Sequence, residues 1–167
     1  MWITGIPSSG KSTFAQALHA HLRERGVASV VLDSDVVRAA LRPTPGYDAE
    51  ARLCFYASLA NLAALLETQG LVAVVPATAH LREYRERARA VAERFLEVYI
   101  DTPKSEAEGR DSKGLYAAAR AGNVHDLPGA DAAYEPPRHP DLVAQGGHDQ
   151  RAVARLADLL ADPGGSG

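Results

Sequence analysis

The stretch Gly5-Ile6-Pro7-Ser8-Ser9-Gly10-Lys11-Ser12 decides the fold. It fits the phosphate-binding pattern G-x-x-x-x-G-K-S/T at every fixed position. Residues 2–4 before it have the character of a strand end, and residues 13–18 after it open a helix. In this order, successive backbone N–H groups point at one anion beside the positive end of the helix dipole. The stretch therefore predicts a phosphate-binding loop rather than a flexible linker with an exposed lysine.

The loop residues predict a nucleoside triphosphate as the ligand. Lys11 can reach the outer phosphates, and the Ser12 hydroxyl can ligate Mg²⁺. We expect ATP and Mg²⁺ to bind here. The expected ATP contacts within the loop are Gly5, Ser8, Ser9, Gly10, Lys11, Ser12 and Thr13.

Composition narrows the class of protein. The chain has 167 residues, of which 46% are hydrophobic, so we expect one domain over residues 1–162 and a disordered tail over 163–167. The net charge of −3 argues against a broad nucleic-acid binder. A single cysteine, Cys54, excludes an internal disulfide, and its helical context predicts a small buried residue.

No apolar run approaches the length of a membrane span, so no membrane contact is expected. The chain begins directly in a predicted strand, which leaves no room for a signal peptide. We therefore expect a cytoplasmic protein.

Strands and helices alternate along the sequence. Buried strands are predicted at residues 27–32, 71–75 and 95–100, and a weak one at 142–144. Helices are predicted after the loop and at 36–41, 49–68, 82–94, 101–110, 116–120 and 149–161. This alternation predicts an α/β protein with the three-layer P-loop NTPase fold, a mostly parallel sheet with helices on both faces. The long irregular segment 111–140 predicts a functional lid.

Two carboxylates follow the second predicted strand. Asp33 and Asp35 lie in Leu32-Asp33-Ser34-Asp35-Val36-Val37-Arg38, and ligands of such sheets bind beyond the carboxyl ends of the strands. One carboxylate could accept a proton from a substrate hydroxyl, and the other could hold Mg²⁺ through water. Arg38, one helical turn after Asp35, could bind an anion. The alternative is an N-cap aspartate with a solvated arginine.

Together with segments further along the chain, these motifs resemble those of the adenylylsulfate kinases. Residues 5–13 and 32–38 resemble the family's first two motifs. Residues 95–103, Phe-Leu-Glu-Val-Tyr-Ile-Asp-Thr-Pro, are similar to its fourth strand, and residues 110–122 resemble its lid. The segment 111–137 is the most specific part, since other phosphate-loop kinases do not share it. The resemblance covers nearly the whole chain.

The family uses MgATP to phosphorylate the 3′-hydroxyl of adenosine 5′-phosphosulfate, giving 3′-phosphoadenosine 5′-phosphosulfate. The resemblance implies that Lys11 and Ser12 hold the ATP phosphates and Mg²⁺. It also implies that Asp35 is the general base and Asp33 the neighbouring metal-side carboxylate. The implied catalytic residues are Lys11, Asp35 and Asp33, and the implied metal ligands are Ser12 and Asp33.

On the acceptor side, the resemblance implies that Arg38 and Arg52 bind the phosphosulfate and that Tyr47 stacks on adenine. Arg110, on the ATP side, and Lys113 belong to the lid. The implied acceptor contacts are Asp35, Arg38, Tyr47, Arg52, Phe55, Thr78, Ala79, Lys113 and Leu127.

Departures from the family pattern cluster on the acceptor side. The usual Asp-Gly-Asp-Asn becomes residues 33–36, Asp-Ser-Asp-Val. Phe55 replaces an asparagine that contacts substrate, and Leu127 replaces the second aromatic residue of the adenine clamp. Residues 76–82, Pro-Ala-Thr-Ala-His-Leu-Arg, replace Ser-Phe-Ile-Ser-Pro-Tyr-Arg. Among them His80 could touch substrate, but a solvated loop histidine is the expectation.

Three hypotheses follow. The chain is an adenylylsulfate kinase of sulfate assimilation with a drifted pocket, a related kinase for another small alcohol or nucleotide, or a nucleotide-binding module without activity. Arg38, Tyr47 and Arg52 favour the first, whereas Phe55 and Leu127 favour the second. The expected partners are small nucleotides. The sequence does not reveal the oligomeric state, although the resembled family is often dimeric, which leaves a homodimer open.

Overall fold

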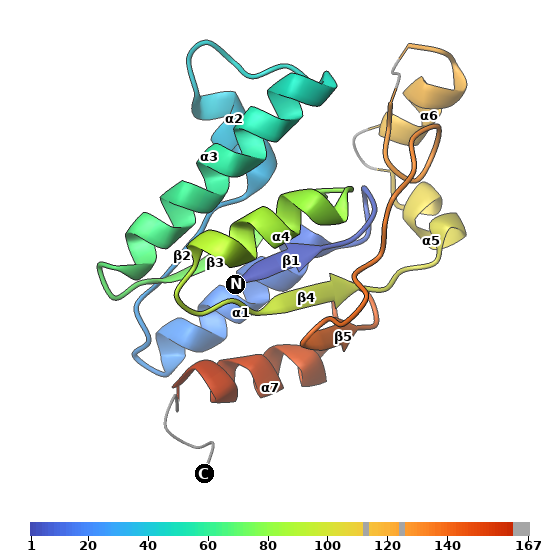
Figure 1. The fold of residues 1–167 in the computed structure, drawn as a ribbon. Coiled ribbons are helices and arrows are strands. Elements are labelled where there is room, and N and C mark those ends of the chain that lie inside the picture. The colour runs from blue at the N-terminus through green and yellow to red at the C-terminus, as the bar shows by residue number, and fades with distance from the viewer. Residues whose placement is uncertain (112–113, 124–125, 162–167) are drawn as a thin grey trace.

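The computed structural model describes residues 1–111, 114–123 and 126–161, which fold around a five-stranded sheet (Figure 1). The strand order is β2-β3-β1-β4-β5, and all four strand pairs are parallel. The strands are β1 (Trp2–Thr4), β2 (Ser29–Val31), β3 (Val72–Pro76), β4 (Glu97–Ile100) and β5 (Leu142–Ala144). This confirms the predicted parallel α/β fold.

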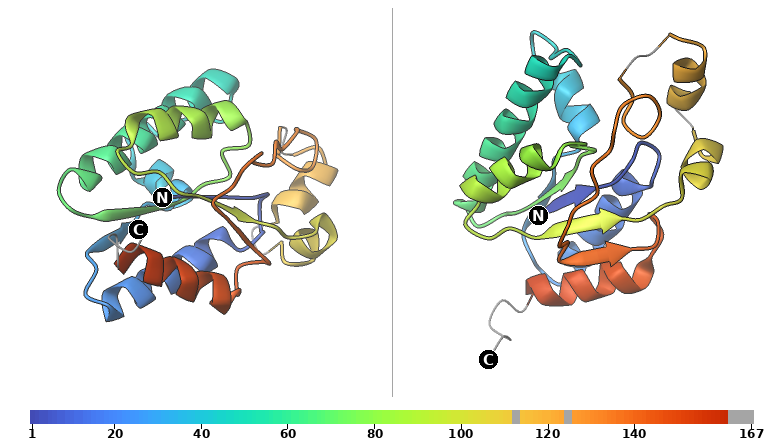
Figure 2. Two further views of the ribbon diagram at one scale, coloured as in Figure 1. Left: turned by 60° about the horizontal axis from the view of Figure 1, so that its bottom comes forward. Right: turned by 45° about the vertical axis from the view of Figure 1, so that its right-hand side comes forward.

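Helices cover both faces of the sheet, as the left view of Figure 2 shows. One face carries α1 (Lys11–Glu24) and α7 (Gln150–Ala161), and the other carries α3 (Ala49–Glu67) and α4 (Arg82–Val91). The remaining helices are α2 (Ser34–Ala40), α5 (Lys104–Gly109) and α6 (Leu115–Arg120). Because all the paired strands run parallel, their carboxyl ends lie at one edge of the sheet.

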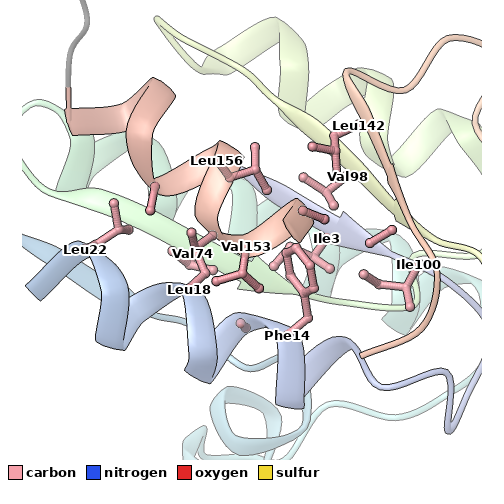
Figure 3. Packing of buried hydrophobic residues seen from close by; sticks show 14 residues of the cluster. Ile3, Phe14, Leu18, Leu22, Val74, Val98, Ile100, Leu142, Val153 and Leu156 are labelled. Atoms are coloured by element: carbon pink, nitrogen blue, oxygen red, sulfur yellow. The ribbon is translucent and has the colours of Figure 1, made fainter. Parts of the chain in front are cut away.

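The core beneath the phosphate loop forms between α1, α7 and the sheet (Figure 3). Phe14, Leu18 and Leu22 recur every fourth residue on α1, and all three are fully buried. They pack with Val153 and Leu156 of α7 and with the central strands. The apolar stripe of α1 therefore anchors the helix whose first turn carries Lys11 and Ser12.

Three sequence-based expectations about these elements are wrong in detail. The apolar run 27–32 forms only a short, half-buried strand, because β2 lies at the sheet edge and lacks a neighbour on one side. The helix α5 begins at Lys104 rather than at residue 101, with Pro103 preceding its first turn. Cys54 is exposed, because the buried face of α3 is occupied by neighbours such as Phe55 and Leu59.

Two further expectations concern a membrane span and the C-terminal tail. No helix among the described residues is long and apolar enough to cross a membrane. The division at residue 162 stays a prediction, and the predicted tail 163–167 lies outside the described residues.

Candidate active site

A cleft of about 800 Å³ opens at the edge of the sheet where the strands end. Of the predicted ATP contacts, all line this cleft except Gly5 and Ser9. Of the predicted acceptor contacts, Phe55 and Ala79 do not line it, and Lys113 lies outside the described residues. Segments far apart in the sequence therefore line one cleft, whose ligands stay a prediction.

The phosphate loop is held by close backbone packing. Gly10 has a φ of 98°, and a Cβ atom there would lie 2.7 Å from the backbone N and Cα of Gly147. Only glycine fits both this backbone conformation and this contact. The Thr102 hydroxyl donates to the Ser9 carbonyl at 3.0 Å, and the Tyr116 hydroxyl donates to the Pro7 carbonyl at 3.1 Å. Three neighbouring segments thus fix the shape of the loop.

The side chains of Lys11 and Ser9 both lie against the loop itself. The Lys11 ammonium folds back over the loop and donates to the carbonyls of Gly5 at 3.0 Å and Ile6 at 2.8 Å. Ser9 is fully buried, and its hydroxyl has no hydrogen-bond partner among the described residues. Ser9 and Gly5 therefore shape the loop from behind, and only their backbone could serve a ligand.

Asp33 connects the loop to the helix α2. Its Oδ2 accepts from the Ser12 hydroxyl at 2.5 Å, while its Oδ1 accepts from the backbone N–H of Asp35 at 3.0 Å and caps α2. The alternative of an N-cap aspartate is thus correct for Asp33, but the same carboxylate also faces the loop. A hydroxyl and a carboxylate side by side are oxygen ligands that fit Mg²⁺ together with nucleotide phosphates. Asp35, in the first turn of α2, lines the cleft with an exposed side chain.

Arg38 is buried rather than solvated, with 5% of its surface exposed. Its guanidinium lies over the ring of Phe55 at 3.8 Å and over the ring of Tyr47 at 4.5 Å. It donates to the carbonyls of Pro45 at 3.1 Å and Gly46 at 2.6 Å. Phe55 therefore faces this arginine and not the cleft, and Tyr47, which is 61% exposed, closes the stack from outside.

Arg52 joins three parts of the chain. Its Nε donates to the Tyr47 carbonyl at 2.5 Å, and its Nη2 donates to the Asp126 carbonyl at 2.9 Å. Its Nη1 lies 3.5 Å from Nδ1 of His80. The residue after Asp126, Leu127, is buried against Tyr116 and also lines the cleft. Arg52 therefore connects the two walls of the cleft while still reaching its interior.

His80 corrects the expectation of a solvated loop histidine, because it is buried beside Arg52 and Tyr84. Burial, followed by the charge of Arg52, lowers the pKa of His80 from 6.5 to about 4. The imidazole is therefore neutral near pH 7. Ala79 before it is fully buried and has a φ of 36°, so this turn is conformationally constrained.

Sequence reasoning missed several residues of the cleft. Tyr56 lines it, and its hydroxyl accepts from the Ala79 N–H at 3.2 Å. Burial raises the pKa of Tyr56. Asp126 and His148 also line the cleft. Tyr56 lies one helical turn after Arg52, and His148 follows the last strand as Asp33 follows the second, so both had a positional signal. Asp126 had none.

The cleft combines a glycine-containing phosphate loop, the Ser12–Asp33 pair and two buried arginines, Arg38 and Arg52. This combination is typical of phosphate-loop kinases that act on small molecules. Comparisons with known proteins narrow this class. The family model described as adenylylsulphate kinase matches residues 1–145, so the chain belongs to the adenylylsulfate kinase family. The adenylyl-sulfate kinase of Paraburkholderia xenovorans is 40% identical over 146 residues, which is 87% of this chain and 82% of that protein.

Two further relatives differ in length. The bifunctional enzyme CysN/CysC of Xylella fastidiosa is 37% identical over 168 residues. That match covers 98% of this chain but only 27% of the bifunctional enzyme. The solved APS kinase CysC of Mycobacterium tuberculosis, in complex with AMPPNP and APS, has a TM-score of 0.87 and 37% identity. That match covers 95% of both chains.

Proposed function

We propose that this chain transfers the γ-phosphoryl group of ATP to the 3′-hydroxyl of adenosine 5′-phosphosulfate. The single observation that carries the proposal is the cleft, which Lys11 and Ser12 line together with Asp35, Arg38 and Arg52. Family membership and the likeness to an APS kinase solved with APS support the same acceptor. The altered residue Phe55 does not oppose it, because Phe55 packs against Arg38 and does not line the cleft. Leu127 does line the cleft, where its aliphatic side chain can pack on a base but lacks the π-surface of an aromatic ring.

The proposed roles follow from position. Lys11 interacts with the transferred phosphoryl group, and Asp35 accepts the proton of the attacking hydroxyl. The acceptor oxygen forms a bond to the γ-phosphorus, the bond from phosphorus to the bridging oxygen of ADP breaks, and ADP leaves. Arg38 and Arg52 offer donors to the phosphosulfate. Mg²⁺, bound through Ser12 and Asp33, would neutralise phosphate charge.

Several finer statements stay predictions. Arg110 lines the cleft but pairs with Glu106 on α5, so its contact with ATP belongs to the proposal. The contact of Lys113 and the lid role of the segment 111–137 are predictions in the same sense. The homodimer and the cytoplasmic location also stay predictions.

The test is product formation by the purified protein and its Lys11→Ala variant. With MgATP and adenosine 5′-phosphosulfate, the wild type is expected to form 3′-phosphoadenosine 5′-phosphosulfate and ADP in equal amounts. Removing a group that faces developing phosphate charge is expected to lower kcat by about 10²–10³-fold. Thermal unfolding of Lys11→Ala should match the wild type. A fully active Lys11→Ala, or a wild type that releases ADP without the second product, would contradict the proposal.

A further inference from the structure

Two of the three nitrogen atoms of the Arg52 guanidinium bond to backbone carbonyls, and the third faces a side chain. Nε and Nη2 are held by backbone carbonyls of Tyr47 and Asp126. The third nitrogen, Nη1, instead lies 3.5 Å from Nδ1 of the His80 side chain. His80 comes from the turn after β3, has 8% of its surface exposed and does not line the cleft. It therefore lies behind Arg52, on the side away from a ligand.

We propose that His80 is a positioning residue for acceptor binding, whose Nδ1 accepts a hydrogen bond from Arg52 Nη1 and fixes the plane of that guanidinium. This inference rests on the proposed function, because it assigns His80 to the acceptor half of the same site.

The direction of the hydrogen bond follows from the chemistry of the two groups. Arginine carries five N–H donors and no acceptor, so its partner must accept. A neutral imidazole has one bare nitrogen, whereas an imidazolium has none. The charged groups around the ring are Arg52, Arg85, Asp126 and Glu135, and burial with the two arginines disfavours a proton on it. His80 is thus suited to accept from Arg52.

The position of His80 is itself fixed from both sides. Its carbonyl accepts from the Glu135 N–H at 2.9 Å, and its ring meets the ring of Tyr84 edge-on with 5.6 Å between centroids. Just before it, the Ala79 carbonyl accepts from Arg85 Nη1 at 2.5 Å. A ring held in this way can define the orientation of a longer side chain that lies against it.

The consequence for the acceptor is geometric. Three N–H groups of Arg52 face Tyr47, Asp126 and His80, and the part of the chain that the structure describes leaves the other two N–H groups for an anion. Their direction is set by the guanidinium plane. Without the third contact, the guanidinium can rotate about its two carbonyl bonds, and part of the binding free energy is spent on ordering it.

Two variants separate this role from simple packing. His80→Asn keeps a carbonyl oxygen where Nδ1 stood, and His80→Leu fills the volume without an acceptor. In steady-state kinetics with MgATP and adenosine 5′-phosphosulfate, His80→Leu is expected to raise the acceptor KM by about tenfold, the scale of a lost hydrogen bond to a charged group. The KM for ATP and kcat should stay within about twofold of the wild type, and His80→Asn should restore most of the acceptor KM.

Three results would overturn the inference: an unchanged acceptor KM in His80→Leu, an equal rise of both KM values, or a His80→Asn variant as impaired as His80→Leu. A wild type that does not phosphorylate adenosine 5′-phosphosulfate would overturn the proposed function and this role with it. An active wild type with an unaffected His80→Leu would overturn this role alone.

A measurement on the wild type covers the case in which His80→Leu fails to fold. Nitrogen-15 NMR of the His80 ring at pH 7 is expected to show the tautomer with the proton on Nε2 and a bare Nδ1. A proton on Nδ1 would overturn the inference, because that nitrogen could not then accept from Arg52.

Discussion

The two halves of the cleft are built in different ways. The phosphate half is one continuous stretch, residues 5–13, whose backbone turns into the first turn of α1. The acceptor half is assembled from α2, α3, the turn after β3 and the segment around Asp126. Its two arginines are buried and held by carbonyls and rings from other segments. The groups that bind phosphate therefore come from one local stretch, whose shape distant segments hold, whereas the groups that bind the acceptor come from several segments and depend on the packing of α2 and α3.

The largest effect is expected where the two halves meet, at Asp35. Asp35→Asn keeps the shape of the side chain and removes its proton affinity, so kcat should fall by about 10²–10⁴-fold, the range for a general base. The affinity for ATP, measured by equilibrium binding, should stay unchanged. A comparable loss in ATP affinity would instead assign Asp35 to the phosphate half as a metal-side group.

The phosphate half can be broken through its backbone alone. Gly10→Ala would place a Cβ atom 2.7 Å from backbone atoms of Gly147 at a φ of 98°. Because backbone cannot give way as a side chain can, the loop must shift, and kcat/KM for ATP should fall by roughly 10²-fold, as expected for a displacement of about 1 Å.

Gly26→Ala is the matched control. Gly26 also has a positive φ, 72°, but a Cβ atom there meets open space. Both variants carry backbone strain of about 1–3 kcal/mol in unfolding free energy, yet only Gly10→Ala should lose activity. Equal kinetic losses in the two would show that strain, and not the contact with Gly147, controls the loop.

A smaller effect is expected from the ring that faces Arg38. Phe55→Leu removes a cation–π contact worth about 0.5–2 kcal/mol, so the acceptor KM should rise by about 2- to 30-fold while the KM for ATP stays constant. Phe95→Leu is the control, because the Phe95 ring lies 4.5 Å from the Arg89 guanidinium, outside the residues that line the cleft. Steady-state kinetics that show the same acceptor KM in both variants would contradict a role for Phe55 in orienting Arg38.

The smallest effect is expected in the pH dependence of the free energy of unfolding, through the protonation of His80. The pKa of His80 is lowered to about 4, below the ordinary value near 6.5 that applies in the unfolded chain. Between these values the unfolded state binds a proton that the folded state excludes, so stability rises with pH through this window. Urea unfolding should show that the wild type loses about 1–2 kcal/mol more than His80→Asn between pH 7 and pH 5. An identical loss in both would mean that the ring titrates normally.

The same contrast between the two halves explains which features of the fold and the site could be predicted from the sequence. The loop, the order of strands and helices and the pairing of Ser12 with Asp33 follow from local patterns and from one rule about strand ends. Phe55 was expected to touch substrate and His80 to be solvated, and both expectations depended on how α3 and the turn after β3 pack. No local pattern reports which side of Arg38 or Arg52 a neighbouring ring will occupy.

A comparison of acceptors tests the proposed activity most directly. ADP release from MgATP would be measured with adenosine 5′-phosphosulfate, adenosine 5′-monophosphate, a sugar acid and a simple sugar under identical conditions. We expect adenosine 5′-phosphosulfate to have the highest kcat/KM, by roughly 10²-fold or more over the sugars, because a site built for charged and polar partners rejects analogues that lack them. A sugar or sugar acid with the highest kcat/KM would contradict it, and would mean that the acceptor half has been rebuilt for another alcohol.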